Sequence, residues 1–412
     1  MGRYLNRHAE RKLHMMLSHF PVVAVLGARQ VGKSTLVDHL NIPGLHTTVF
    51  DPVVDVGGAR QDPDFFLQNH PTPAFLDEIQ YAPELLATIK RRVDRERRPG
   101  TYIISGSQNL AVLRGIAESL AGRVAILRLW AFTQRELSGR INAPGFLEPF
   151  VRSPEWDPLE HRVAGPTSAY EAIHRGGMPG LLDLPSELHE TYFDSYRQTY
   201  IERDVRKAAD IGALQTFGRF YGLLAALSAR ELNHNQLGRE LGIDRKSAKR
   251  WTEIASATYQ WHELPAYSLN AIKRLSGKPK GYFADTGLAC HLQGITTPRT
   301  LAQHPLSGHL FETFVVLEIL KGITTWSAAP PSVYHFRAHS GAEVDLILEQ
   351  DGLLFPIEVK MKARPTKGDC RGIHALPRHF PSARIGRGLV VCATEEVQRL
   401  AENVYAVPWW AL

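Results

Sequence analysis

The stretch Gly27-Ala28-Arg29-Gln30-Val31-Gly32-Lys33-Ser34-Thr35 decides the fold of this chain of 412 residues. It matches the phosphate-binding loop pattern G-x-x-x-x-G-K-[ST] at every fixed position. The apolar, β-branched residues 21–26 precede it and predict a buried parallel strand. Residues 35–40 predict the beginning of a helix. A chance match in a glycine-containing turn would not explain a strand and a helix that are both in register with the loop.

The residue types of this loop suit the binding of ATP. Its two fixed glycines allow successive backbone N–H groups to point at phosphate oxygens, and a helix N-terminus adds a favourable field for the anion. We expect Lys33 to contact the β- and γ-phosphates. Ser34 would ligate Mg²⁺ through its hydroxyl, with Thr35 in a supporting role.

A second motif, the apolar run 74–76 followed by Asp77 and Glu78, is typical of a Walker B strand. Acidic side chains at the C-terminal end of a strand face the crevice where ligands bind in open α/β sheets. We expect Asp77 to hold Mg²⁺ and Glu78 to activate the attacking water. A helix-capping role for Asp77 accounts poorly for two acids in a row. Because a protein that only binds nucleotide has no need of Glu78, the pair favours hydrolysis.

The composition is that of an ordinary globular protein, with 44% hydrophobic and 22% charged residues. The length predicts two or three domains. A net charge of +6 and a pI of about 9.1 favour a polyanionic partner. No signal peptide or membrane-spanning run is visible, which predicts a cytoplasmic protein that does not enter a membrane. Three cysteines without metal spacing predict buried or free thiols in a reducing compartment: Cys290, Cys370 and Cys392.

Residues 1–165 predict the ATPase core, an α/β domain with a parallel sheet covered on both faces. Its five strand candidates are 21–26, 46–50, 73–77, 101–105 and 124–129. Ser107, which follows the fourth strand, would contact the γ-phosphate or the attacking water, although a turn with a helix cap explains it almost as well. The stretch 141–166, rich in proline and glycine, predicts a surface linker at the end of this domain.

Residues 166–300 predict a helical lid with a winged-helix region. Residues 235–251 have the rhythm of a helix-turn-helix, in which Gly242 supplies the turn and Asp244 caps the second helix. The outward face of that helix would meet DNA phosphates through Arg245, Lys246, Lys249 and Arg250. A following hairpin, 264–268 with 280–285, would carry a basic tip formed by Lys273, Arg274, Lys278 and Lys280. A lid or a protein contact is the alternative role of such a module.

Residues 187–207 predict one long helix with Arg203 near its end. A solvated helix face explains this arginine without any function. As an arginine finger, it would reach the γ-phosphate of ATP bound to a neighbouring subunit. Arg123 is a second candidate for that role. A finger of this kind would require a homo-oligomer, for which a hexamer is one expected size.

The region 301–412 carries a different set of charged residues. Glu312 lies in a predicted helix, Asp345 in a predicted strand, and Glu358 and Lys360 in the strand that follows. Residues two apart on a strand share one face, and neighbouring carboxylates bind a hard divalent cation. This is the D…E-x-K pattern of restriction-endonuclease-like folds, in which the lysine orients water or stabilises developing charge. The set is more specific for the fold than for nuclease activity.

Together these motifs resemble a prokaryotic family of AAA-type ATPases whose C-terminal region is a domain of unknown function. The resemblance spans nearly the whole chain and rests on residues 27–35, 75–80, 105–107, 120–123, 200–205, 282–288 and 343–360. It implies a P-loop ATPase core, a winged-helix region and a nuclease-like C-terminal fold. It does not imply a settled substrate.

The sequence therefore predicts an Mg²⁺-dependent ATPase that binds DNA and remodels it or moves along it, as a helicase or a branch-migration motor would. An alternative is a slow ATP-dependent switch or scaffold that binds a protein partner. A second alternative is a metal-dependent nuclease under the control of ATP. Turnover stimulated by DNA would separate the first reading from the second, and metal-dependent cleavage without ATP would favour the third.

Overall fold

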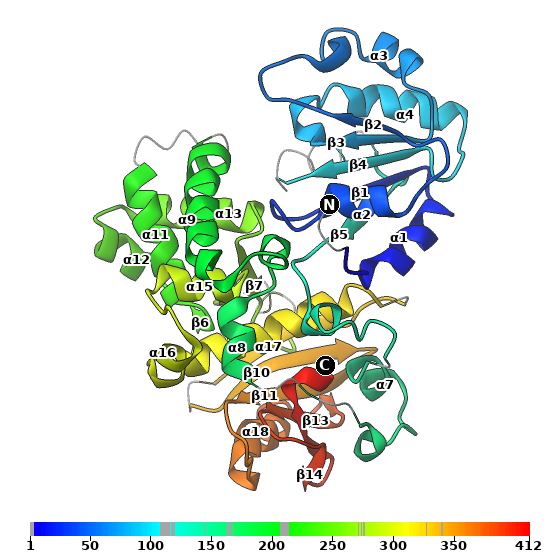
Figure 1. Ribbon diagram of the computed structural model, residues 1–412. Helices are drawn as coiled ribbons and strands as arrows, with labels where there is room; N and C mark the ends of the chain where they lie inside the picture. Colours follow the sequence, from blue (N-terminus) through cyan, green and yellow to red (C-terminus); the bar gives the residue numbers. More distant parts are fainter. Residues whose placement is uncertain are drawn as a thin grey trace. The chain divides into compact units, whose positions relative to one another are not determined.

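The computed structural model describes residues 4–107, 116, 120–143, 145–162, 165, 168–206, 214–270, 272, 274, 277–326, 328–338 and 341–412, with the backbone alone at 202–204. The chain forms two compact units (Figure 1). The N-terminal unit comprises Met1–Phe132, Met178–Asp183 and Ile254–Gln260. The C-terminal unit comprises Thr133–Gly177, Leu184–Glu253 and Trp261–Leu412. This division does not follow the three predicted domains, which stay a prediction.

The N-terminal unit is built on a parallel five-stranded sheet in the order β2-β3-β4-β1-β5 (Figure 1). The predicted strands are confirmed as β1 (Val22–Leu26), β2 (His46–Val49), β3 (Ala74–Asp77), β4 (Tyr102–Gly106) and β5 (Val124–Arg128). Every residue of β1, β3 and β4 is buried, because a parallel sheet is covered on both faces. This order is that of a P-loop fold, and it brings the ends of β1 and β3 to the same edge of the sheet.

The helical elements of this unit are α1 (Ala9–Leu17), α2 (Lys33–His39), η1 (Val56–Gly58), α3 (Pro63–Asn69), η2 (Ile79–Tyr81), α4 (Leu85–Arg95) and η4 (Pro179–Leu181). Gly32 caps α2 in the left-handed conformation, with φ 89°. Asp62 caps α3 by accepting a hydrogen bond from the backbone N–H of Phe65. The apolar side of α4 is buried at Leu85, Leu86, Thr88, Ile89 and Val93.

The C-terminal unit contains a mixed seven-stranded sheet, in the order β14-β15-β13-β11-β10-β9 with β12 also paired to β11. Its strands are β9 (Ser332–Arg337), β10 (Glu343–Gln350), β11 (Leu353–Lys360), β12 (Arg384–Ile385), β13 (Gly388–Cys392), β14 (Gln398–Ala401) and β15 (Val404–Pro408). β10 and β11, the two strands predicted to carry Asp345 and the Glu358–Lys360 pair, form an antiparallel hairpin, and β13 lies parallel to β11. The fold is therefore α/β in both units, as predicted.

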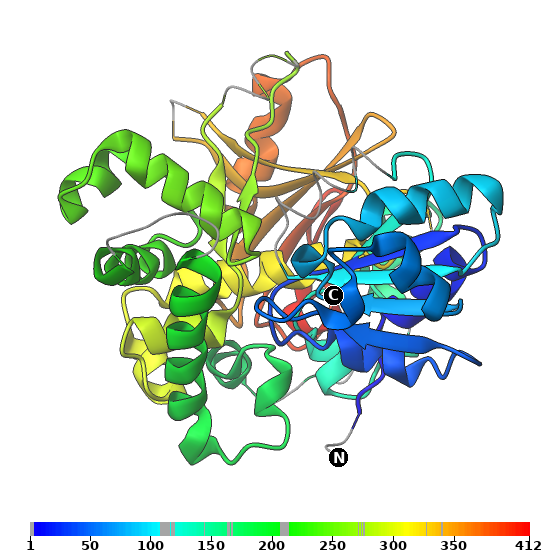
Figure 2. The same ribbon diagram turned by 90° about the horizontal axis from the view of Figure 1, so that it is seen from above.

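Other helical elements of this unit are α6 (Gln134–Leu137), α7 (Leu147–Arg152), η3 (Pro158–Glu160), α8 (Ala169–Arg175), η5 (Ser186–Leu188), α9 (His189–Thr199), α11 (Leu214–Ala226), α15 (Thr286–Leu292), α16 (Pro298–Gln303), α17 (Ser307–Ile323), η7 (Lys367–Cys370), α18 (Arg371–His379) and η8 (Trp409–Ala411). The mostly buried helix α17 packs against β11, as Figures 1 and 2 show. The long helix predicted over 187–207 is α9, which continues as a π-helix over Tyr200–Val205.

The predicted helix-turn-helix consists of α12 (His234–Leu241) and α13 (Arg245–Ala257). Gly242 lies between the two helices with φ 68°, and Asp244 accepts a hydrogen bond from the backbone N–H of Ser247. A small antiparallel sheet in the order β6-β8-β7 accompanies them, formed by β6 (Arg230–Glu231), β7 (Trp261–Leu264) and β8 (Lys280–Phe283). β7 and β8 form an antiparallel pair as predicted, but β7 ends at Leu264, where the predicted strand 264–268 begins, and Ala266 beyond it bridges to His335 instead.

The stretch 141–166 was predicted as a linker, but its described part carries α7 and η3 and packs within the C-terminal unit. The ring of Phe150 lies edge-on to the rings of Phe355 and Tyr405. The guanidinium of Arg387 donates to the carbonyl of Trp156 at 2.7 Å and also contacts the carbonyl of Phe150. Aromatic burial therefore fixes a segment that its proline and glycine content alone would leave as a loop.

The three cysteines are free and buried, as predicted. Within the described ranges, no helix is both long and apolar enough to cross a bilayer.

Candidate active site

The loop after β1 has the backbone shape that its glycines permit. A Cβ atom at Gly27 would lie 2.2 Å from the carbonyl oxygen of Leu129, which no side chain tolerates. Gln30 and Gly32 both adopt positive φ angles, 59° and 89°. Val31 is buried, Ala28 packs against the apolar core of the unit, and Thr35 is exposed.

Lys33 is buried and lies across this loop. Its ammonium donates hydrogen bonds to the carbonyl oxygens of Gly27, at 3.2 Å, and Ala28, at 2.9 Å. Arg29 points to a different element and donates to the hydroxyl of Tyr81 at 3.2 Å. A cation held by carbonyls at the centre of the loop is positioned to transfer its hydrogen bonds to phosphate oxygens.

Ser34 and Asp77 meet as the two motifs predict. The Ser34 hydroxyl donates to Oδ2 of Asp77 at 2.6 Å. The hydroxyl of Ser105, on β4, donates to the other oxygen, Oδ1. A residue of the neighbouring strand therefore fixes the Asp77 carboxylate. The same carboxylate is hydrogen-bonded to the hydroxyl of Ser34 in the P-loop.

Glu78 occupies a sharp left-handed turn directly after β3, with φ 58° and ψ 44°. Its backbone N–H donates to Asp77 Oδ1 at 3.1 Å and to the Ser105 hydroxyl at 3.2 Å. Its side-chain Oε2 accepts hydrogen bonds from the amide of Gln80 and, at 3.2 Å, from the hydroxyl of Ser107. The structure thus holds the predicted catalytic carboxylate against the predicted polar residue after β4.

Three further residues belong to this site that the sequence did not predict: Gln80, Ser105 and Arg7. Ser105 and Gln80 lie within quoted motifs, and their spacing from Asp77 and Glu78 could have drawn attention to them. Arg7 gave no local signal. Its buried guanidinium donates to the carbonyl of Val31 at 3.0 Å and to that of Trp130 at 2.6 Å, so it ties the P-loop to the segment after β5.

The predicted acids and lysine of the C-terminal region also come together. Asp345 Oδ2 accepts hydrogen bonds from the backbone N–H of Val359, at 2.9 Å, and from Lys360, at 3.3 Å. Lys360 also donates to Glu358 Oε2 at 2.7 Å. Glu312, on α17, reaches the same place through Lys280, whose ammonium lies 2.6 Å from Glu312 Oε1 and 3.4 Å from Asp345 Oδ1.

The prediction for Lys280 is wrong, because the sequence placed this residue on an exposed basic tip and the structure buries it. Its side chain is only 4% exposed, and its ammonium also lies 2.9 Å from Glu343 Oε1. Lys280 is the first residue of the strand β8, all of whose residues are buried.

Three of these acids, Glu312, Asp345 and Glu358, have shifted pKa values, and the shifts differ in direction. Burial raises the pKa of Glu312 to about 8 and that of Glu358 to about 8, and the charge of Asp345 adds to both shifts. Against the effect of burial, Lys280 and Lys360 hold the pKa of Asp345 below its usual range. Asp345 is therefore the acid of this group that keeps its negative charge most firmly.

Among the residues that the structure describes, no group of three or more His, Cys, Asp or Glu side chains is placed to hold a metal ion. Asp345, Glu358 and Glu312 instead point at lysine ammonium groups. The second metal site stays a prediction, and this geometry argues against it.

The predicted DNA contacts fall into two groups. The side chains of α13 are exposed at Arg245, Lys246, Lys249 and Arg250. On the hairpin, Lys273 lies outside the described residues. Arg274 pairs with Glu349 at 3.1 Å and donates to the hydroxyl of Tyr334 at 3.4 Å.

Of the two candidate arginine fingers, Arg203 belongs to the π-helix, but its side chain lies outside the described part of the chain. Arg123 forms an ion pair with Asp94, in which Nη2 lies 3.0 Å from Oδ2.

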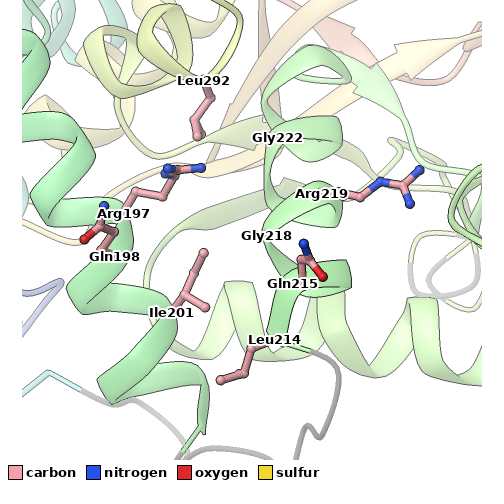
Figure 3. Close-up of a pocket in the computed structure, with 9 residues that line it drawn as sticks. All are labelled: Arg197, Gln198, Ile201, Leu214, Gln215, Gly218, Arg219, Gly222 and Leu292. Carbon is pink, nitrogen blue, oxygen red and sulfur yellow. The ribbon is translucent and has the colours of Figure 1, made fainter.

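A separate pocket of about 710 Å³ lies in the C-terminal unit, between α9 with its π-helix and α11 (Figure 3). Its lining residues are Arg197, Gln198, Ile201, Leu214, Gln215, Gly218, Arg219, Gly222 and Leu292. Its two arginines would suit an anionic group.

Residues 19–138 match a family described as an AAA domain. Residues 307–412 match a domain of unknown function, DUF4143. The chain joins a P-loop domain of AAA type to a C-terminal DUF4143 domain. Between them, residues 167–299 match another domain of unknown function, DUF8612.

Two relatives of this chain are "Uncharacterized protein Mb2031c" of Mycobacterium bovis and "Uncharacterized protein Rv2008c" of Mycobacterium tuberculosis. Each is 28% identical over 408 residues, which is 98% of this chain and 83% of the relative. Among solved structures, a Walker-type ATPase of Pyrococcus abyssi is 17% identical, with a TM-score of 0.45 over 70% of this chain and 96% of that one. The RuvB Holliday junction branch migration motor of Thermotoga maritima is 17% identical, with a TM-score of 0.30 over 66% of this chain and 95% of that one. Overlaps of this size say nothing about what this chain acts on.

Proposed function

We propose that this P-loop ATPase requires Mg²⁺ and couples ATP hydrolysis to DNA binding, as an enzyme that remodels DNA or moves along it would. The observation that carries the DNA part of this proposal is the face of α13, where four basic side chains are exposed on one helix: Arg245, Lys246, Lys249 and Arg250. Cations gathered on the second helix of a helix-turn-helix suit the phosphates of a duplex.

The residues of the N-terminal unit fit ATP with Mg²⁺. The Ser34 hydroxyl and the Asp77 carboxylate lie 2.6 Å apart, and both supply the oxygen ligands that Mg²⁺ prefers. These two residues would hold the ion. When bound, Mg²⁺ neutralises charge on the β- and γ-phosphates.

The other residues act on phosphate and water. Lys33 would exchange its two loop carbonyls for phosphate oxygens, and Arg7 would keep the loop in place. Glu78 would take the proton of the attacking water. Because both described donors to Glu78, Gln80 and Ser107, contact Oε2, we assign the water to Oε1. A fixed carboxylate lowers the cost of orienting the base at the moment of attack.

Replacing the four basic residues of α13 by alanine is expected to weaken DNA binding uniformly across sequences. Each phosphate contact that is lost should lower the salt slope of the affinity by roughly one. DNA should then no longer stimulate ATP turnover, while turnover without DNA stays as in the wild type. The measurements are fluorescence anisotropy at several salt concentrations and the ATPase rate with single-stranded, duplex and branched DNA.

A matched control removes four exposed arginines at the end of α4 instead: Arg91, Arg95, Arg97 and Arg98. Equal weakening by both variants would mean that net charge, rather than the position of α13, governs binding. Unchanged affinity and slope in the α13 variant would make α12 and α13 a lid or a protein contact. ATP turnover that no form of DNA stimulates would contradict the proposal as a whole.

We further propose that the active form is a homo-oligomer in which Arg203 reaches the ATP of the next subunit. Arg203→Ala subunits keep the P-loop, and Lys33→Ala subunits keep the arginine. Mixing the two inactive variants is therefore expected to restore part of the ATPase activity. Mixing Arg123→Ala with Lys33→Ala is the control, since Arg123 is paired with Asp94 in its own chain. A protein that stays monomeric by light scattering with ATP and DNA present would contradict this arrangement.

A further inference from the structure

The C-terminal unit contains four neighbouring acids, three of which contact one buried lysine, Lys280. We call Glu312, Glu343, Asp345 and Glu358 the carboxylate cluster. The ammonium of Lys280 lies 2.6 Å from Glu312 Oε1, 2.9 Å from Glu343 Oε1 and 3.4 Å from Asp345 Oδ1. It therefore occupies the point at which three of the four carboxylates converge.

We propose that Lys280 takes the place of a metal ion, so that the DUF4143 domain binds no divalent cation at the carboxylate cluster and does not use it to cut DNA. Mg²⁺ and Ca²⁺ need oxygen ligands at about 2.0–2.6 Å with little else between them. Here a monovalent cation already fills that position. A divalent ion beside it would meet the repulsion of a like charge in a poorly solvated site.

The position of Lys280 is set by a strand and not by a flexible tip. Its backbone pairs with Leu264 on β7 and with Glu231 on β6, so the residue lies inside the small three-stranded sheet. The neighbouring side chain on the same face of β8, Tyr282, donates its hydroxyl to Glu312 Oε1 at 3.0 Å. The lysine is thus anchored among the acids through the backbone and through its own three contacts.

The remaining side of the cluster is also occupied. Asp345 Oδ2 accepts from the Val359 N–H and from Lys360, which in turn contacts Glu358 Oε2. The backbone of helix α18 packs against Glu358 and the main chain of Glu343. A Cβ atom at Gly372 would lie 2.1 Å from Glu358 Oε1 and 1.9 Å from the carbonyl oxygen of Glu343. The E-x-K pair is therefore engaged in internal ion pairs, with backbone pressed against it.

Lys280 also lies outside the DUF4143 match, within the residues that match DUF8612. The cation that neutralises the cluster thus comes from the preceding region of the chain. Asp345, Glu358 and Lys360 alone give the pattern of a metal-dependent nuclease. With Lys280 present, the acids of this pattern form ion pairs with a lysine from the preceding region, and these ion pairs join two regions of the C-terminal unit.

The test is thermal unfolding of the full chain without nucleotide, in the presence and absence of Mn²⁺. We expect Mn²⁺ to shift the melting temperature of the wild type no more than that of Asp345→Asn, because any ion that these two proteins bind would lie at Ser34 and Asp77 in the N-terminal unit. Lys280→Met should melt lower, because it leaves buried acids without a partner, and Mn²⁺ should restore its melting temperature by binding the folded state. Electron paramagnetic resonance should show one more bound Mn²⁺ per chain in Lys280→Met than in the wild type, held at the cluster at least about tenfold more tightly than by the wild type.

Lys321→Met is the matched control. Lys321 is also a buried lysine of this unit, and the ion pair that the structure describes for it is with Glu318, at 2.9 Å. This variant should lose stability without any recovery in Mn²⁺. In Lys280→Met, adding Asp345→Asn should abolish the gained Mn²⁺ site.

Three outcomes would overturn the proposal. The first is Mn²⁺ bound by the wild type and lost in Asp345→Asn, which would show a metal site with the lysine present. The second is a folded Lys280→Met that gains no Mn²⁺. If that variant does not fold, Lys280→Gln, of similar length and polar, takes its place. The third is failure of both variants to fold even when Mn²⁺ is supplied throughout expression, because the proposal requires the ion to replace the ammonium.

Discussion

Glu78→Gln is expected to bind ATP as the wild type does and to hydrolyse it roughly 10²- to 10⁴-fold more slowly, the usual contribution of a positioned general base. Glutamine has nearly the shape of glutamate, so it can still accept the hydrogen bonds that Gln80 and Ser107 donate to Oε2. It has no basic oxygen with which to take a proton from water. Binding and chemistry should therefore separate in this variant.

The measurement pairs single-turnover ATP hydrolysis with equilibrium binding of a fluorescent ATP analogue. Glu84→Gln is the control, since Glu84 is an exposed acid a few residues further along the chain. It should change neither quantity. Ser107→Ala should slow turnover less than Glu78→Gln, because it loosens the base without removing it. A Glu78→Gln enzyme that turns over at the wild-type rate would show that Glu78 is not the base.

The sequence predicts the N-terminal sheet well because its signals are local. Each strand is a short apolar run, and the P-loop glycines and the Asp77–Glu78 pair mark where two of those strands end. Parallel pairing then brings Ser34 and Asp77 within 2.6 Å of each other without further information. The helix-turn-helix is likewise local, since the left-handed turn at Gly242 and the cap at Asp244 are set by neighbouring residues.

The partners of long buried side chains could not be predicted in this way. Arg7 reaches the P-loop from before the first helix, and Lys280 reaches three acids on α17 and β10. In a sequence, each is one more basic residue in a mildly basic chain. Arg274 illustrates the same limit, because its place in the hairpin suggests an exposed tip whereas the structure pairs it with Glu349. Only the packing of distant elements decides which cations are buried.

The two candidate sites also show why a motif alone does not establish an activity. In both, the residue types of the pattern are complete and the side chains converge. In the N-terminal unit, the hydrogen bonds that the structure describes to Asp77 and Glu78 come from hydroxyls, an amide and a backbone N–H group, which are neutral donors and do not cancel the negative charge of the two acids. In the carboxylate cluster, two lysines compensate that charge. We therefore expect a divalent cation to bind with ATP at the first site and not to bind at the second.

Lys33→Ala is expected to weaken ATP binding roughly hundredfold or more, since it removes a cation that makes charge-assisted hydrogen bonds to two phosphates. Lys33 is buried and donates to the carbonyls of Gly27 and Ala28. The substitution thus also removes two hydrogen bonds within the loop. Calorimetric titration of ATP with Mg²⁺ measures the affinity, and circular dichroism checks that the fold survives.

Lys33→Arg tests whether the shape of the cationic group matters in addition to its positive charge. Arginine keeps the positive charge but spreads it over a planar guanidinium, which does not fit where a compact ammonium lies between two loop carbonyls. We therefore expect Lys33→Arg to bind ATP more weakly than the wild type and more tightly than Lys33→Ala. Lys90→Ala, on α4 and outside the loop, should leave the affinity unchanged. ATP binding by Lys33→Ala at the wild-type affinity would mean that the backbone of the loop alone carries the phosphates, and Lys33 would then have no part in the site.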